Sequence, residues 1–282
     1  MKIYVSVDLE GLPGVASLTM LNPWSSQFNR PVKILSRLLN ALSEELFNNG
    51  ATEVYIADSH GLMVNIDYNE MDGRVNLIQG YPRPYSMLTG LDSSFDTAMF
   101  IGYHAAAGTI HGVLDHTMSG RAFSEIFVND IKFSEFLLNS LFAGEKGVPV
   151  ALLAGDEYLK EEVEKYYPEC VFVPLKKGLS RYSAMYPGID RVVELLRRGT
   201  REAIEKVRSK RIKPFRLQSP YKARIVLRDS LVADVLEEMS GIKRTGAYTV
   251  EYVAENAAQL LGTIEIIAYI AYGIDSLKNN IR

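Results

Sequence analysis

Three apolar segments of this 282-residue chain each end in side chains that can bind a metal ion. Acids and imidazoles follow segments 3–7, 53–57 and 97–101 in turn: Asp8 and Glu10, then Asp58 and His60, then His104. Open α/β folds bind ligands at the carboxyl ends of parallel strands, so we expect these side chains to meet in one crevice. Carboxylates and imidazoles without a nearby thiolate suit zinc or a similar divalent metal. The pattern therefore predicts a metal-dependent hydrolase.

The first acidic pair has two interpretations. Asp8 and Glu10 lie two residues apart, so a regular strand would place both on one face, and Gly11 lets the backbone turn directly afterwards. The alternative is that both are exposed acids on a loop, and this interpretation would be preferred if the pair stood alone. An acid that follows an apolar strand would be costly to bury without a partner, which keeps the pair a candidate ligand set.

The histidines are few and clustered. The chain has four, which are His60, His104, His111 and His116. A single histidine near a strand end is more often a hydrogen-bonded structural residue than a ligand. Here two lie at equivalent strand ends and two more follow within a dozen residues of His104, which favours a metal site. Asp58 either orients an imidazole or caps a turn, and the sequence leaves both roles open.

Other charged residues near the predicted site have ordinary interpretations as well as functional ones. Glu135 lies near the start of a predicted helix, where an acid in the first turn complements the helix dipole. Four cations near the predicted site loops could bind a substrate carboxylate, although solvated surface charge is their usual role: Arg121, Lys176, Lys177 and Arg181.

Several functional classes are not indicated. The chain has no Walker A loop, no G-x-S-x-G motif and no C-x-x-C pair. Cys170 is the only cysteine and has no base signature beside it, which argues against a cysteine nucleophile and fits a reducing compartment. The net charge of -3 predicts neither a nucleic-acid partner nor an anionic membrane. The N-terminus begins a strand without a signal-peptide pattern, so we expect a cytoplasmic protein.

Strand and helix patterns alternate through most of the chain. This alternation predicts an α/β fold, a three-layer α/β/α arrangement with a mostly parallel sheet, plus a smaller C-terminal α/β part. The apolar spacing from Ile34 to Leu46 predicts a helix with one buried stripe. Lys213-Pro214 is the best boundary, which divides the chain into a metal-binding catalytic domain, 1–214, and a C-terminal subdomain packed on it, 215–282.

The segment 254–274 is apolar enough to resemble a membrane span. Its apolar runs are interrupted by Gln259, Gly262, Glu265 and Gly273 and are shorter than the roughly 20 residues that a span needs. We therefore expect a mostly buried closing helix and no membrane partner.

A set of short motifs occurs in a specific order and spacing. They are Val5-Ser6-Val7-Asp8-Leu9-Glu10-Gly11, Ala57-Asp58-Ser59-His60, Gly102-Tyr103-His104-Ala105, Asp115-His116-Thr117-Met118, Asn129-Asp130 with Glu135 and Asn139, Ala154-Gly155-Asp156 and Lys177-Gly178-Leu179-Ser180-Arg181. Together they resemble the di-zinc D-aminopeptidase family, which includes proteins once named dipeptide transport proteins. The resemblance covers residues 1 to 185 by motif and the rest by element order.

The resemblance implies a complete site. By it, two zinc ions are held by Asp8, Glu10, His60, His104 and Glu135, with Asp8 bridging both ions. His116 matches the family's catalytic histidine, which is proposed there as a nucleophile. Family members remove an N-terminal D-amino acid from short peptides and assemble into decamers of two stacked pentameric rings, so we expect a homo-oligomer that acts on short peptides.

The chain departs from the family pattern at a few positions. The loop from His104 to His116 is one residue longer and contains His111, while Ala106 replaces an expected basic residue and Ser134 an expected glycine. These changes leave the ligand set intact but bear on the substrate pocket. Two alternatives therefore remain: a di-metal amidohydrolase or L-specific peptidase on the same scaffold, and a ring-forming protein with structural metals. For His116 we favour proton transfer or stabilisation of the tetrahedral intermediate over a covalent acyl-histidine.

Overall fold

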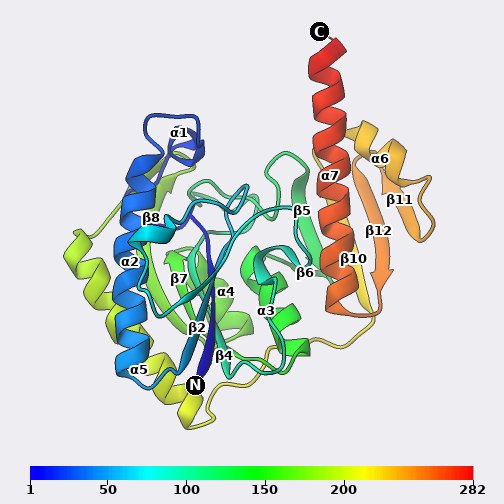
Figure 1. The fold of residues 1–282 in the computed structure, drawn as a ribbon. Helices are drawn as coiled ribbons and strands as arrows, with labels where there is room; N and C mark the ends of the chain where they lie inside the picture. The colour runs from blue at the N-terminus through cyan, green and yellow to red at the C-terminus, as the bar shows by residue number, and fades with distance from the viewer. Residues whose placement is uncertain (282) are drawn as a thin grey trace.

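A computed structural model of the chain, which describes residues 1–281, contains two β-sheets flanked by helices (Figure 1). The larger sheet has the order β3-β2-β1-β4-β7-β8-β9 and is parallel except for the hairpin of β8 and β9. Its strands are β1 (Lys2–Val7), β2 (Glu53–Asp58), β3 (Asn76–Ile78), β4 (Thr97–Tyr103), β7 (Val150–Asp156), β8 (Val171–Ser180) and β9 (Ser183–Met185). The predicted α/β class and mostly parallel sheet are confirmed.

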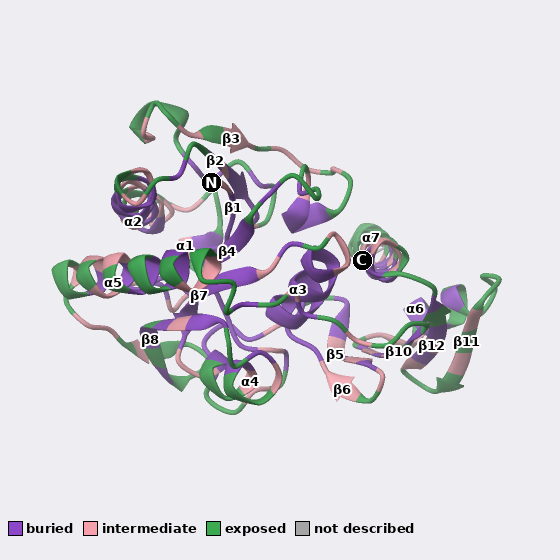
Figure 2. Ribbon diagram, turned by 90° about the horizontal axis from the view of Figure 1, so that it is seen from below, coloured by how far each residue is buried: buried purple, intermediate pink, exposed green. Residues whose placement is uncertain are grey.

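Helices cover both faces of this sheet. On one face, α2 (Asn29–Asn48) packs against α5 (Ile189–Arg208); on the other lie α3 (Glu135–Glu145) and α4 (Leu159–Tyr166) (Figure 2). The predicted stripe of α2 is buried at Leu35, Leu38, Leu39, Leu42 and Leu46. Because both faces are covered, the central strands are largely apolar, and every residue of β4 and β7 is buried.

The strand order creates a crevice beside β1. From β1 the chain runs through α1 (Leu18–Leu21) and α2 to β2 on one side, and later returns to form β4 on the other side. The carboxyl ends of β1 and β4 thus lie at a topological switch point, which is where open α/β sheets bind ligands.

The second sheet is antiparallel, with the order β11-β12-β10-β5-β6. It consists of β5 (Phe123–Val128), β6 (Ile131–Lys132), β10 (Tyr221–Leu227), β11 (Ile242–Gly246) and β12 (Thr249–Ala254), together with α6 (Ser230–Leu236) and α7 (Ala257–Ile281). Because β5 and β6 precede residue 214, this sheet combines segments from both sides of the predicted boundary. The division at residue 214 stays a prediction.

The closing helix differs from expectation in its burial. α7 packs on α3, α6, β10 and β12, and its C-terminal turns project beyond the sheets (Figure 1). Only 39% of its most apolar stretch is buried, so the prediction of a mostly buried helix is wrong. Apolar side chains such as Ile266, Tyr272 and Leu277 lie exposed on it. By length and composition alone α7 could cross a membrane, a test that core helices of other proteins also pass.

Candidate active site

The backbones that follow β1 and β4 approach each other unusually closely. Asp8 N donates to the carbonyl oxygen of Ile101 at 2.8 Å, and Gly11 N donates to that of Gly102 at 2.7 Å. A Cβ on Gly11 would lie 1.8 Å from the Tyr103 oxygen, and one on Gly102 would lie 1.9 Å from the Asp8 oxygen. Gly102 also has a φ of +77°, a region that L side chains rarely adopt. Glycine at both positions therefore lets the two ligand-bearing loops interlock.

The structure brings all five predicted ligands and His116 together. His60 Nδ1 lies 2.8 Å from Glu10 Oε2 and 3.4 Å from Asp8 Oδ1. On the other side, His104 Nε2 lies 3.4 Å from Asp8 Oδ2 and 3.5 Å from Glu135 Oε1. The two oxygens of Asp8 thus face different histidines, which is the arrangement that a bridging carboxylate needs.

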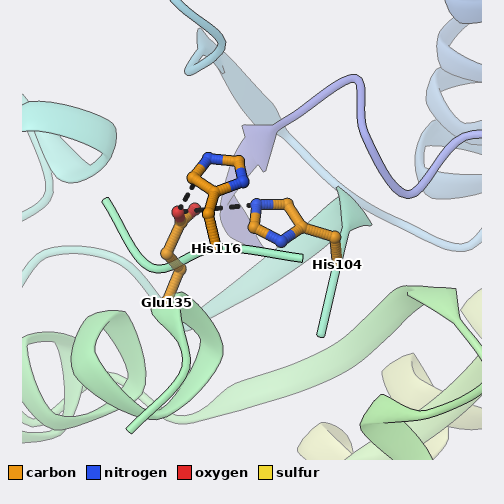
Figure 3. A group of neighbouring side chains, drawn as sticks. All are labelled: His104, His116 and Glu135. Carbon is orange, nitrogen blue, oxygen red and sulfur yellow. Dashed lines mark ion pairs between the residues drawn. The ribbon is translucent and has the colours of Figure 1, made fainter. Parts of the chain in front are cut away.

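His116 completes the cluster on the side of Glu135. Its Nε2 lies 3.6 Å from Glu135 Oε1, and its ring stacks on that of His104 with centroids 4.1 Å apart (Figure 3). Its Nδ1 lies 2.9 Å from the carbonyl oxygen of Leu114. A carbonyl oxygen only accepts, so Nδ1 carries the ring proton and donates a hydrogen bond to it. Nε2 is consequently left with a lone pair that faces the acidic cluster.

The donor set fits divalent metal. Asp8 Oδ2 and His104 Nε2 are both inaccessible to solvent and have no hydrogen-bond partner within residues 1–281. Two groups of three side chains, which share His104, each have ligand atoms within 4.8 Å of one another: Asp8, Glu10 and His104, and His104, His116 and Glu135. Buried polar atoms without a partner are costly, and a cation bound between these two atoms would satisfy both.

Crowding of buried charges shifts the pKa values at this cluster. Burial, reinforced by the carboxylate of Glu10, raises the pKa of Asp8 to about 8. Burial opposes ionisation of Glu10 too, but the charge and hydrogen bond of His60 hold the pKa of Glu10 well below its usual value. Burial and the charge of His104 lower the pKa of His116. Such a concentration of shifted groups in one cavity is typical of functional sites.

Hydrogen bonds hold both the helix that carries Glu135 and its carboxylate. Ser134 is the N-cap of α3, and its side chain accepts from Leu137 N at 3.3 Å. Ser134 Oγ in turn donates to Glu162 at 2.5 Å, which is a role that glycine could not fill. The backbone N of Met118 donates to Glu135 Oε1 at 2.7 Å, so the His116 loop orients this carboxylate.

The roles that the sequence left open are now distinguishable. Asp58 accepts from the backbone N of Asn65 at 2.5 Å and of Ile66 at 2.8 Å, so it caps the loop after β2, and within residues 1–281 no hydrogen bond or ion pair joins it to an imidazole ring. His111 is exposed and lies apart from the cluster. Ala106 is not among the described residues that line the active-site cavity.

The four candidate cations lie in different environments. Arg181 binds Asp115, with 2.9 Å between Nη1 and Oδ1, and Lys177 lies at the surface. Lys176, by contrast, is 2% exposed and donates to the backbone oxygens of Glu10 and Val15. The expectation of solvated charge is therefore wrong for Lys176, which ties β8 to the loop that carries Asp8 and Glu10. Arg121 is exposed and lines the cavity.

A cavity of about 550 Å³ opens onto the cluster. Side chains from the second half of the chain form part of its wall, among them Glu265, Tyr269 and Tyr272 of α7. The sequence pattern did not associate these residues with the site. Their only local signal was the charge of Glu265 within an apolar helix.

Comparisons with known proteins agree with this geometry. The D-aminopeptidase family of peptidases, M55, matches residues 1–266. A D-aminopeptidase of Bacillus subtilis (strain 168) is 30% identical over 272 residues, which cover 96% of this chain and 98% of that protein. The solved structure of the Zn-dependent D-aminopeptidase DppA from Bacillus subtilis, described as a self-compartmentalizing protease, superposes with a TM-score of 0.91 at 30% identity. That match covers 96% of this chain and 98% of the other.

Proposed function

The chain belongs to the D-aminopeptidase family, and we infer from this that it is a zinc-dependent aminopeptidase that releases N-terminal D-amino acids from short peptides. The observation that carries the inference is the cluster of three carboxylates and three imidazoles at the switch point of the sheet, open to a cavity. The intact donor set argues against a structural metal site, which usually closes with four ligands and prefers cysteine.

We propose that two zinc ions occupy this cluster. Asp8, Glu10, His60, His104 and Glu135 would hold them, with Asp8 shared, because its two oxygens face His60 and His104 separately. When bound, such a pair polarises the scissile carbonyl and lowers the pKa of a water molecule. Three carboxylates against two dications would leave the site net positive, which favours the developing oxyanion.

In this mechanism His116 moves protons. Its Nδ1 is occupied by the Leu114 carbonyl, so Nε2 is the atom that can accept a proton and later donate it to the leaving amine. The Leu114 contact and the stacked ring of His104 hold the imidazole in place during both transfers.

We further propose that the protein is a cytoplasmic homo-oligomer, a decamer of two pentameric rings. The description of its relative as self-compartmentalizing supports assembly, and large apolar side chains such as Trp24, Tyr68 and Ile110 are 88%, 74% and 77% exposed. Sedimentation equilibrium should give about 315 kDa, ten times the 31.5 kDa chain. A monomer mass would contradict the proposal.

The function is tested with matched D-alanyl and L-alanyl dipeptides. Zinc-loaded protein should cleave the D-substrate, and a chelator-treated sample should not. Cleavage of the L-substrate alone would instead support an L-specific peptidase, and cleavage of neither would refute the peptidase assignment.

A further inference from the structure

One acidic residue of the active-site cavity lies outside the predicted metal cluster. The cavity wall contributed by α7 includes Glu265, Tyr269 and Tyr272. The other acids that line the cavity, within the part of the chain that the structure describes, are all predicted metal ligands: Asp8, Glu10 and Glu135. Glu265 therefore adds a carboxyl group outside the cluster to the space that a substrate would fill.

The carboxyl group of Glu265 is incompletely satisfied. Its Oε1 is shielded from solvent and has no hydrogen-bond partner among residues 1–281, while the hydroxyl of Ser86 bonds to the group. The charge of Arg83 acts on Glu265, but the Arg83 guanidinium donates to the carbonyl oxygens of Asp58 at 2.6 Å and Ser86 at 2.9 Å. An incompletely paired carboxyl group destabilises a fold, and Glu265 also lines the substrate cavity, so a cationic group bound there would compensate it.

Two aromatic rings stand beside this carboxylate. Tyr81 and Tyr269 both line the cavity, with ring centroids 5.7 Å apart and an angle of 41° between their planes. Burial raises the pKa of the Tyr81 hydroxyl, with further contributions from Tyr269 and from the charge of Glu265, so Glu265 lies near this ring. A carboxylate flanked by aromatic rings is the combination that recognises an ammonium group, through a hydrogen bond and a cation–π contact.

We propose that Glu265, with the rings of Tyr81 and Tyr269, binds the positively charged amine of the peptide substrate. The proposal rests on the proposed function, which supplies a substrate with a free N-terminus. The amine is either the α-ammonium group or the side-chain ammonium of a basic residue. Either source makes Glu265 a specificity-determining residue, because it places the peptide relative to the metal cluster at the inner end of the cavity.

The test compares zinc-loaded wild type with Glu265→Gln, which keeps shape but removes charge. Glu255→Gln is the matched control, since Glu255 is exposed just before α7 and does not line the cavity. The substrates are D-Ala-Gly-Gly, D-Lys-Gly-Gly and D-norleucyl-Gly-Gly. We expect Glu265→Gln to raise KM about 10-fold or more, with kcat and zinc content retained, and Glu255→Gln to match wild type.

The pattern across substrates identifies the amine. A rise in KM for all three peptides assigns Glu265 to the α-ammonium group, and a rise for D-Lys-Gly-Gly alone assigns it to the basic side chain. Unchanged KM for all three, or lost zinc with unchanged KM, overturns the proposal.

A binding measurement separates this proposal from the proposed function. Calorimetric titration of n-butylammonium into the zinc-loaded proteins requires no turnover. Wild type should bind the probe about 10-fold more tightly than Glu265→Gln, even if wild type cleaves no peptide. Equal binding by the two proteins, or no binding by wild type, refutes the ammonium site whatever the enzyme assays show.

Discussion

Substitution of Gly102 by alanine should disrupt the metal site through the backbone alone. Alanine at a φ of +77° costs about 1–2 kcal/mol of folding free energy. The new Cβ would also lie 1.9 Å from the backbone oxygen of Asp8, whereas ordinary contact begins at 3.4 Å. Relief of this overlap requires the two loops to separate by about 1.5 Å, at a further cost of about 1–3 kcal/mol.

The loops that must separate are those that carry Asp8 and His104. A displacement of about 1 Å in catalytic geometry can lower activity about 100-fold, so we expect at least that loss in kcat/KM and weaker zinc binding. Gly147→Ala is the matched control, because Gly147 has a φ of +80° and nothing within 4 Å of a Cβ. Gly147→Ala should lose only the about 1–2 kcal/mol that alanine costs at a positive φ, and it should keep its zinc.

The assay measures urea unfolding, zinc per chain after dialysis, and kcat/KM for both variants. The difference in stability between Gly102→Ala and Gly147→Ala isolates the contact with Asp8. If the two variants unfold alike, and Gly102→Ala retains zinc and activity, the interlocked loops do not position the ligands.

Three further changes test the site and its surroundings. His116→Ala should keep its zinc and lose about 100- to 10,000-fold in turnover, because only proton transfer is removed; loss of zinc would identify His116 as a ligand. Asp8→Ala should lose both ions, as its two oxygens face separate histidines, and retention of two zinc ions per chain would contradict bridging. Burial raises the pKa of Glu162 from 4.5 to about 7. Between these two pH values the folded state therefore holds a proton that the unfolded state has released. The free energy of unfolding should fall by up to about 3 kcal/mol as pH rises from 4.5 to 7. Glu162→Gln should lack this decline in urea unfolding, and a decline equal to that of wild type would refute the buried titration.

The meeting of four candidate ligands was predictable because its signal is local. Asp8, Glu10, His60 and His104 each follow an apolar strand directly, and the carboxyl ends of parallel strands meet whatever the rest of the chain does. The stripe of α2 is equally local, since helical spacing alone shows which leucines face the sheet. The order of the short motifs then identified the family.

The outer parts of the site depended on tertiary structure. Lys176 donates to an oxygen 166 residues away, and no local pattern distinguishes a buried lysine from a solvated one. The pairing of β5 with β10 and the placement of Glu265 against the cavity likewise join segments about 100 or more residues apart. Sequence periodicity reports which face of an element is apolar, but not which distant element covers it. The sequence by itself therefore determined which candidate metal ligands gather at the sheet edge, whereas only the packing of α7 and β8 decided what surrounds them.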